Sequence, residues 1–431
     1  MFKFGGTNQI IKYLLFGTVI LVPFVYLPLW SIIDFFYWPK YLSLVLITSI
    51  LLIVLLLNMN RLKEWFHFDL INKLLLLYFI LITISLFFSL DPALSIQGNF
   101  LRYDGYTTQV MYIVLFLFAR TIQTIDKRFI YLVAISSGLL SIYGIIQYLG
   151  YEPFIRDLTR MNWTSAFSTF GNQNFFGSYL VLQLPIQMYI IIVLNKRWAY
   201  ITYIISFIAL LMTMTRSGWI GYCVSFLYLL IYIIIKNHRK STRSKSIYFI
   251  SVLNIIIFIW FNLFIDNQLL IRILSIINDS MTLVSTSYSL NPDKIDQLGS
   301  IRIFIWLRVI KLIKMKPFFG FGIENLHLAF YQFFSKDIVH TMGQYMSVDK
   351  AHNDYLHIAV SSGIPSLIVY LLFIISSLID GIMKRNNTLN LFIFASVIGY
   401  LVCLFFNISV VSVAYILWIY LGLLCSYEKS N

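Results

Sequence analysis

Long uninterrupted apolar stretches are the feature that most restricts how this chain of 431 residues can fold. A run of about 17–25 apolar residues is long enough for a helix to cross the hydrocarbon core of a bilayer. About twelve such runs follow one another along the sequence. Hydrophobic residues make up 59% of the chain and charged residues only 12%, whereas soluble domains are about 45–50% apolar and about 25% charged. The sequence therefore predicts an all-α, polytopic membrane protein with about twelve transmembrane helices.

The apolar runs also define where the predicted spans lie. They cover residues 11–33, 41–57, 73–90, 107–120, 129–149, 174–194, 199–214, 218–235, 247–265, 356–379, 389–407 and 409–425. Further spans follow the first run directly, so we interpret it as a retained helix and not as a cleaved signal peptide. Only a short stretch around Arg216 separates the seventh span from the eighth.

The lysines and arginines between the spans predict the side that each loop faces, because cytoplasmic loops carry an excess of these residues. When the strongly basic segment 236–245 is placed in the cytoplasm, most other basic loops fall on the same side and both termini are cytoplasmic. The short outer loops then hold only Lys40, Arg102, Arg156, Arg160 and Arg216. Basic residues on this disfavoured side indicate an anionic partner there, or contact with lipid headgroups.

One long outer segment interrupts the series of spans. Residues 1–265 contain the first nine predicted helices, residues 266–355 form the outer segment, and residues 356–431 contain the last three helices and a short tail. A connection of this length is uncommon without structure of its own. We therefore expect residues 266–355 to fold as a large outer-face domain.

The outer segment contains a predicted amphipathic helix near residues 300–316. At about 100° per residue, Arg308, Lys311 and Lys314 share one face, which we expect to contact solvent or headgroups. Arg302 falls on the opposite, apolar face. A buried arginine needs a partner. The alternatives are a ligand or an internal carboxylate such as Asp293, Asp296 or Glu324.

Two further segments bring polar groups to the outer face. Arg216 is flanked by small residues, which allow helices to approach closely and leave room for a ligand. His352 opens the tenth span beside Asn353, and the helical period puts it on one face with Tyr355. Guanidinium groups bind phosphate bidentately, and a histidine accepts a proton near neutral pH. This combination indicates transfer of a group from a lipid phosphate to a hydroxyl.

Several other functions lack their sequence signatures. The chain has no D-x-D, no H-E-x-x-H and no Cys/His cluster with metal spacing, so we expect no metal and no cofactor. It has no Walker A sequence, so ATP-driven transport is not indicated. Its partners are expected to be a lipid-linked substrate, an acceptor and the bilayer, and not nucleic acid.

At these residues the chain resembles the O-antigen ligase family of bacterial membrane glycosyltransferases, which also includes O-antigen polymerases and protein O-oligosaccharyltransferases. The similar stretches are STFGNQNFFGSYLVLQLP (168–185), TRSGWIGY (215–222), IRIFIWLRVIKLIKMKPFFGFGIEN (301–325) and AHNDYLHIAVSSGIPSLIVYL (351–371). RYDGY (102–106) is similar to an outer-loop motif of related members. Members commonly have Asn-Pro-Asn where this chain has Asn172-Gln173-Asn174.

The resemblance implies a GT-C type fold with a large outer loop. It implies metal-independent transfer of a glycan from undecaprenyl diphosphate to a lipid, glycan or protein hydroxyl, outside the bacterial cytoplasmic membrane. Arg216 and Arg302 match the family's diphosphate-binding arginines, and His352 matches its essential histidine, proposed to activate the acceptor. We add Arg102 as a candidate diphosphate ligand. The supporting candidates are Asn353, Tyr355, Asn172 and Asn174.

Two functions from other classes remain open at this stage. A lipid-linked glycan flippase or transporter would carry charged residues at mid-membrane around a continuous cavity, and the predicted spans contain few. A peptidoglycan polymerase of the related SEDS type would use an outer-loop carboxylate in place of His352. The carboxylates available for that role are Asp279, Asp293, Asp296 and Asp349.

Overall fold

The computed structural model describes ten stretches of the chain. They are residues 5–27, 35–100, 102–152, 165–236, 241–267, 270–272, 274, 301–344, 346–384 and 388–427. These stretches contain helices and turns but no strand. Eight described helices are long and apolar enough to cross a membrane, and α9, α18 and α19 are shorter apolar helices. The chain is therefore an all-α, multi-pass membrane protein, as the apolar runs predicted.

Each of the twelve predicted spans overlaps one helix of the structure. In chain order these are α1 (Gly5–Leu21), α2 (Tyr37–Leu57), α4 (Leu70–Phe87), α6 (Tyr106–Arg120), α7 (Lys127–Tyr148), α8 (Gln173–Ile192), α9 (Ala199–Met212), α10 (Arg216–Lys236), α11 (Thr242–Phe264), α17 (Ile364–Met383), α18 (Thr388–Leu404) and α19 (Ala414–Leu424). The shorter elements are η1 (Val22–Phe24), η2 (Met59–Arg61), α3 (Leu62–Trp65), α5 (Pro92–Gln97), η4 (Ser168–Phe170), α14 (Arg302–Met315), α15 (Leu326–Met342) and α16 (Asp354–Ser362).

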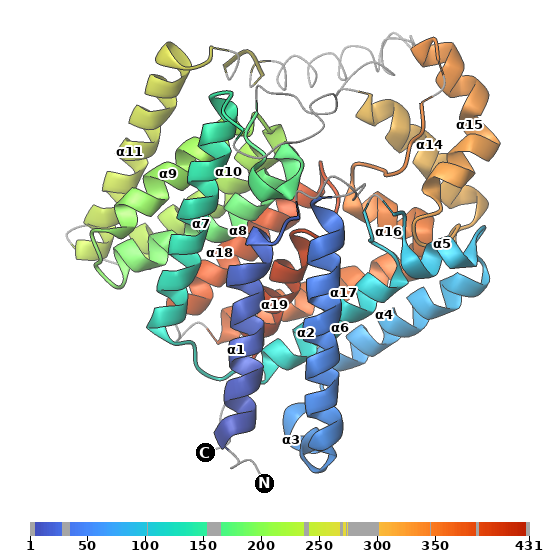
Figure 1. Cartoon of the computed structure of the whole chain (residues 1–431), viewed down its shortest axis with the longest axis horizontal. Helices are drawn as coiled ribbons and strands as arrows, with labels where there is room; N and C mark the ends of the chain where they lie inside the picture. Colours follow the sequence, from blue (N-terminus) through green and yellow to red (C-terminus); the bar gives the residue numbers. More distant parts are fainter. Residues whose placement is uncertain are drawn as a thin grey trace.

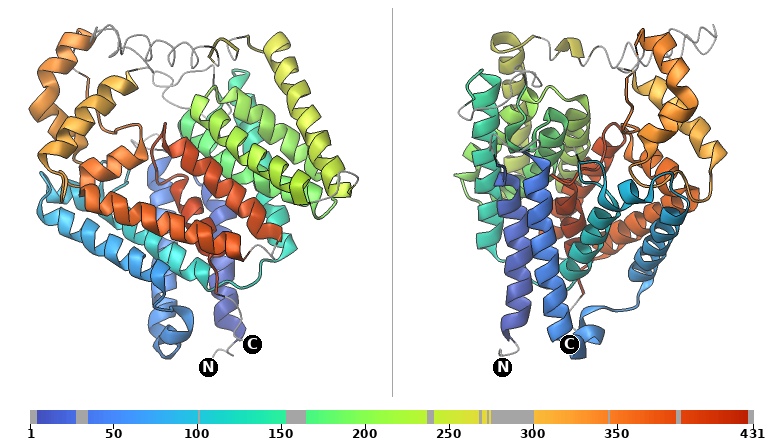
Figure 2. Two further views of the ribbon diagram at one scale, coloured as in Figure 1. Left: turned by 180° about the vertical axis from the view of Figure 1, so that it is seen from behind. Right: turned by 45° about the vertical axis from the view of Figure 1, so that its right-hand side comes forward.

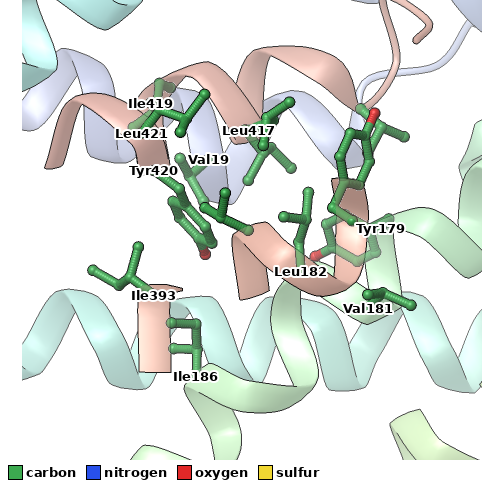
Figure 3. Packing of buried hydrophobic residues seen from close by; sticks show 14 of the residues in the cluster. Val19, Tyr179, Val181, Leu182, Ile186, Ile393, Leu417, Ile419, Tyr420 and Leu421 are labelled. Atoms are coloured by element: carbon green, nitrogen blue, oxygen red, sulfur yellow. The ribbon is translucent and has the colours of Figure 1, made fainter. Parts of the chain in front are cut away.

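Helix α8 lies at the centre of the bundle and is buried along its whole length. It packs against α7, α9, α10 and α18. The neighbouring buried helix α19 packs against α6, α17 and α18. Figure 3 shows Leu182 and Ile186 of α8 close to Tyr420 and other side chains of α19. The buried amide oxygen of Gln183 accepts a hydrogen bond of 3.1 Å from the Tyr420 hydroxyl, so this oxygen has the partner that a buried polar atom needs.

Two glycines allow α10 and α18 to cross closely. A Cβ atom added to Gly221 would lie 2.5 Å from the carbonyl oxygen of Gly399, and one added to Gly399 would lie 2.8 Å from that of Gly221. Small residues at such crossings allow helix backbones to touch in membrane proteins. Figure 2 shows a second side-by-side pair, α4 and α17, on the opposite side of the molecule.

The described part of the outer segment forms a second hydrophobic cluster. Its members come from α14, the connection between α14 and α15, α15, α16 and residues 348–351: Phe304, Ile305, Val309, Leu312, Ile313, Phe321, Leu326, Ala329, Phe330, Phe334, Ile338, Val348, Ala351, Ala359 and Val360. In Figure 1, α14 and α15 lie at the end of the bundle opposite to the start of α1 and the C-terminus. Helix α14 lies at the position of the predicted amphipathic helix. Residues 275–300 lie outside the described part of the chain, so the division of the chain at residues 265 and 355 stays a prediction.

Two span boundaries differ from the prediction. The first helix ends at Leu21 and a 3₁₀ turn that includes Pro23 follows it, so the helix stops well before residue 33. Residues 356–379 are not one helix, because Gly363 separates α16 from α17 with φ +90°. A Cβ atom at Gly363 would collide with the carbonyl oxygen of Phe318. Counting apolar residues did not reveal this break, although Ser362, Gly363 and Pro365 are a local signal for it.

Two basic residues assigned to loops are buried instead. Lys40 lies in α2, is fully buried, and donates hydrogen bonds to the carbonyl oxygens of Val25 (2.8 Å) and Thr169 (2.6 Å). Arg120 ends α6, is 2% exposed, and binds both carboxylate oxygens of Asp69 at 3.0 and 2.6 Å. Both residues therefore contact protein groups, and Lys40 is not evidence for an anionic ligand at the outer face.

Candidate active site

The three principal candidates each stand at the start of a helix. Arg216 is the first residue of α10, and Arg302 is the first residue of α14. His352 directly precedes Asn353, the N-cap of α16. Helix N-termini expose unpaired backbone N–H groups and carry partial positive charge, so they favour anions.

Helix α9 ends at Met212, and helix α10 begins at Arg216. Thr213 and Met214 form a turn in which Met214 has φ +53°, and α9 and α10 run on its two sides. The expected separation of the seventh and eighth spans at Arg216 is therefore correct. The small residues are used for packing, because Gly218 lies against Gly177 of α8 and the Thr215 hydroxyl. They leave less room for a ligand than the sequence suggested.

Electrostatic interactions place Arg216, Arg302 and His352 in one neighbourhood. Burial lowers the pKa of Arg302, and the positive charge of Arg216 lowers it further. Burial also lowers the pKa of His352 from 6.5 to about 4, with Arg302 as the next cause and a smaller contribution from Arg102. Asp349 acts in the opposite direction. Like charges nearby disfavour the protonated form, so His352 is a neutral imidazole at neutral pH.

The guanidinium group of Arg302 is partly buried and makes no hydrogen bond or ion pair with the residues that the structure describes. Glu324, one carboxylate that the sequence offered as its partner, binds Lys350 instead. Asp293 and Asp296 lie outside the described residues. Arg302 is thus a partly buried cation near a second cation, and the described residues provide no counter-ion for it. An anion that binds between the two guanidinium groups would stabilise this arrangement.

The opposite face of α14 differs from the expectation at one residue. Lys311 and Lys314 are exposed, as predicted. The side chain of Arg308 is only 13% exposed: it approaches Asp337 of α15 to 3.6 Å and lies over the ring of Phe304 at 3.8 Å. The prediction that Arg308 is solvated is wrong, because α15 covers that part of the helix.

The segment around His352 is not helical, which corrects the expected shared face with Tyr355. His352 has φ +50°, in the left-handed region, and α16 starts two residues later at Asp354. The Tyr355 hydroxyl donates to the carbonyl oxygen of Leu401 in α18 at 2.8 Å. The Asn353 side chain caps α16 by accepting from the backbone N–H of Leu356 at 3.0 Å. Both supporting candidates thus make structural contacts.

Arg102 lies close to the same neighbourhood but is ion-paired. Its Nε is 2.8 Å from the Asp349 carboxylate, and its guanidinium group lies 5.9 Å from the centre of the Phe175 ring. Although burial opposes it, the negative charge of Asp349 raises the pKa of Arg102. Since the contact with Asp349 uses only Nε, the terminal nitrogens remain available to an anion. Arg156 and Arg160 lie outside the described residues.

Asn172 and Asn174 shape the start of α8. The Asn172 side chain is the N-cap and accepts from the Asn174 backbone N–H at 2.8 Å. The Asn174 carbonyl oxygen accepts from the Asn407 side chain at 3.2 Å. Gln173 is the first helical residue, the position where proline is most favoured. The replacement of Asn-Pro-Asn by Asn-Gln-Asn therefore keeps the helix start.

A buried charged cluster beside the site escaped the sequence analysis. Lys350 is 2% exposed, bonds to the Glu324 carboxylate, and lies 3.5 Å from Asp104 Oδ2. Together with His357 these side chains line a pocket with a cavity volume of about 50 Å³. Arg216, Arg302 and His352 are not among the residues that line it. Asp104 lies in the motif RYDGY and Glu324 lies in GIEN. These two motifs were the features of the sequence from which the buried cluster could have been predicted.

Of the four carboxylates considered in place of His352, the structure describes only Asp349. It is ion-paired with Arg102, and no described contact links it to Arg302 or Arg216. A role as the reacting base is therefore less suited to Asp349 than to His352, whose imidazole makes no hydrogen bond with the described residues.

Comparison with known proteins bears on the same residues. A family model described as O-Antigen ligase matches residues 201–371. The match runs from α9 into α17 and includes Arg216, Arg302 and His352, while Arg102 and Asn172 lie before it. No curated protein sequence matches the chain. Over residues 201–371 the chain is therefore similar to the O-antigen ligase family.

Proposed function

We propose that the chain transfers a glycan from undecaprenyl diphosphate to an acceptor hydroxyl at the outer face of the bacterial cytoplasmic membrane. The family supports the broader activity, a membrane glycosyltransferase of the O-antigen ligase or polymerase type. The donor, the acceptor and the use of a metal-free mechanism are our proposal. So is the orientation, with both termini in the cytoplasm and α14 to α16 outside.

The observation that carries the proposal is that Arg302 lies close enough to Arg216 for the two positive charges to repel each other. Burial and the charge of Arg216 both disfavour the charged form of Arg302, and no described carboxylate offsets them. A diphosphate carries negative oxygens on two phosphorus atoms, so it can bind both guanidinium groups bidentately. The terminal nitrogens of Arg102 are a further candidate contact.

The same arrangement suits the chemistry of transfer. The acceptor oxygen forms a bond to the anomeric carbon as the bond from that carbon to the diphosphate oxygen breaks. The acceptor's proton passes to the imidazole of His352, and undecaprenyl diphosphate leaves with its electron pair. Arg216 and Arg302 stabilise the charge that develops on the leaving group. A neutral His352 is in the protonation state that a general base requires.

The members of the family differ in their acceptor. Lipid, growing glycan and protein hydroxyls are all compatible with a histidine base and an arginine-bound diphosphate. We therefore propose a ligase as the first function, with a polysaccharide polymerase and a protein O-oligosaccharyltransferase as the alternatives. A single product with one transferred glycan indicates a ligase, whereas a ladder of products from one donor indicates a polymerase.

The test uses purified protein in lipid nanodiscs and one lipid-diphosphate-linked oligosaccharide. His352→Ala is expected to abolish transfer and to retain donor binding. Arg216→Lys is expected to weaken donor binding, because an ammonium group cannot form the bidentate contact. Lys311→Met, on the exposed face of α14, is the control and should behave like the wild type. Wild-type turnover of His352→Ala would show that His352 is not the base.

A further inference from the structure

The segment from Asp349 to Asp354 is held by contacts on both sides of His352. Asp349 pairs with Arg102 at 2.8 Å, and Lys350 bonds to Glu324. The carbonyl oxygen of Ala351 accepts from the Trp306 indole at 2.9 Å. After His352, Asn353 caps α16, and Asp354 accepts from the Ser409 backbone N–H at 2.9 Å. His352 is the one residue of the six for which the described structure records no such contact.

Lys350 is the most deeply buried of the charged anchors. Its side chain is 2% exposed, and the two carboxylates beside it, Glu324 and Asp104, are 3% and 6% exposed. Asp104 is held in turn, because its Oδ1 accepts from the Val411 backbone N–H at 2.7 Å. The cluster therefore joins three segments that are far apart in the chain to the position two residues before His352.

The conformation of His352 needs such anchors. A residue other than glycine with φ +50° is strained, and strain of this kind persists only where the surroundings determine the backbone. The imidazole of this strained residue is partly buried and lies close enough to Arg302 to feel its charge. If Lys350 lost its contacts with Glu324 and Asp104, the backbone at His352 could relax and the imidazole would move.

We propose that Lys350, held by Glu324 and Asp104, is a positioning residue that sets the His352 imidazole against Arg302 and the bound diphosphate. Lys350 does not touch the reacting atoms in this role. It acts by fixing the backbone between the Arg102–Asp349 ion pair and the N-cap of α16. The inference rests on the proposed function and adds a residue and a cluster to it.

Glu324→Gln is the first test, because glutamine keeps the shape and removes the charge that binds Lys350. A displacement of the base by about 1 Å can reduce the rate by about a hundredfold. We expect turnover to fall 10- to 100-fold and donor affinity to stay within about twofold. Asp337→Asn, which alters the Arg308–Asp337 pair elsewhere on the outer segment, should leave both quantities unchanged.

A double-mutant cycle separates positioning from a general structural effect. If Lys350 acts through His352, Lys350→Met should lower the wild-type rate but leave the residual rate of His352→Ala unchanged. A second readout does not depend on activity: in Glu324→Gln the pKa of His352, followed by NMR, should rise from about 4 towards 6.5 as the imidazole leaves Arg302. The pKa measurement tests the positioning role even if the residual rate of His352→Ala is too small to measure.

The outcomes distinguish this inference from the proposed function. If His352→Ala abolishes transfer but Glu324→Gln keeps wild-type turnover and an unchanged His352 pKa, the positioning role is wrong and the proposed function stands. A parallel loss of donor affinity and turnover in Glu324→Gln also contradicts positioning. If His352→Ala keeps wild-type turnover, the proposed base fails, whatever Glu324→Gln does.

Discussion

Replacing Arg302 by methionine should raise the pKa of His352. The imidazole has a pKa of about 4 against an ordinary value of 6.5. That difference corresponds to about 3 kcal/mol in favour of the neutral form. Burial is the largest cause and Arg302 the next. Methionine keeps most of the burial and removes the repulsion, so we expect the pKa to rise by about one pH unit, or about 1.4 kcal/mol, and to stay below 6.5.

The assay is an NMR titration of protein in detergent with ¹³C-labelled histidine. The chain has six histidines, and the spectrum of His352→Gln assigns the resonance of interest. Lys311→Met is the matched control, because it removes a positive charge from the exposed face of the same helix. The control should leave the midpoint unchanged.

The same shift makes a prediction for stability, with a definite sign. The native state binds a proton at His352 less readily than the unfolded chain does, so the free energy of unfolding falls as the pH drops below 6.5. For values of 6.5 and about 4, the loss at pH 5 relative to pH 8 is about 2 kcal/mol. His352→Gln should lack this contribution. A wild-type midpoint near 6.5, or no response to Arg302→Met, would refute the claim that burial and Arg302 keep His352 neutral.

Four other changes test the fold and the mechanism. Arg120→Met leaves the Asp69 carboxylate without its bidentate partner and should cost on the order of 3 kcal/mol, measured as a lower melting temperature in detergent with donor affinity unchanged. Gly363→Ala should destabilise the protein by about 1–3 kcal/mol or more, because φ +90° and the contact with the Phe318 carbonyl both exclude a Cβ atom; thermal unfolding measures it. Tyr355→Phe removes one hydrogen bond to α18 and should cost about 1 kcal/mol while turnover changes by less than about twofold. Treatment with EDTA should leave glycan transfer unchanged, because in the proposed mechanism arginine charges take the part that a metal ion plays in other transferases; a loss restored by added divalent cation would contradict this.

The sequence was sufficient to predict an all-α membrane protein and the order of its apolar helices. Hydrophobic runs identify spans because the bilayer requires them locally, without regard to the rest of the chain. Loop charges separated α9 from α10 at Arg216, and the helical period identified Arg302 as the basic residue on the apolar face of α14. Each of these inferences uses residues close together in sequence.

Tertiary contacts decided the features that the sequence left unpredicted. Lys350 pairs with Glu324 across 26 residues, and with Asp104 across a much longer stretch of chain. Arg120 looked like a cytoplasmic loop charge, because only the fold brings Asp69 and the carbonyl oxygen of Cys425 around it. His352 looked helical, because the composition of the segment does not record that its backbone is left-handed.

The charges around His352 also suggest an order to the proposed reaction. In the free protein Arg302 and Arg102 both oppose protonation of the imidazole. A diphosphate bound between the arginines would offset their charge, so the imidazole would become a stronger base when the donor is in place. The base would then be weakest when the site is empty and strongest when a leaving group is ready. An arrangement of this kind links donor binding to activation of the acceptor without any movement of the backbone, which agrees with a His352 segment anchored on both sides.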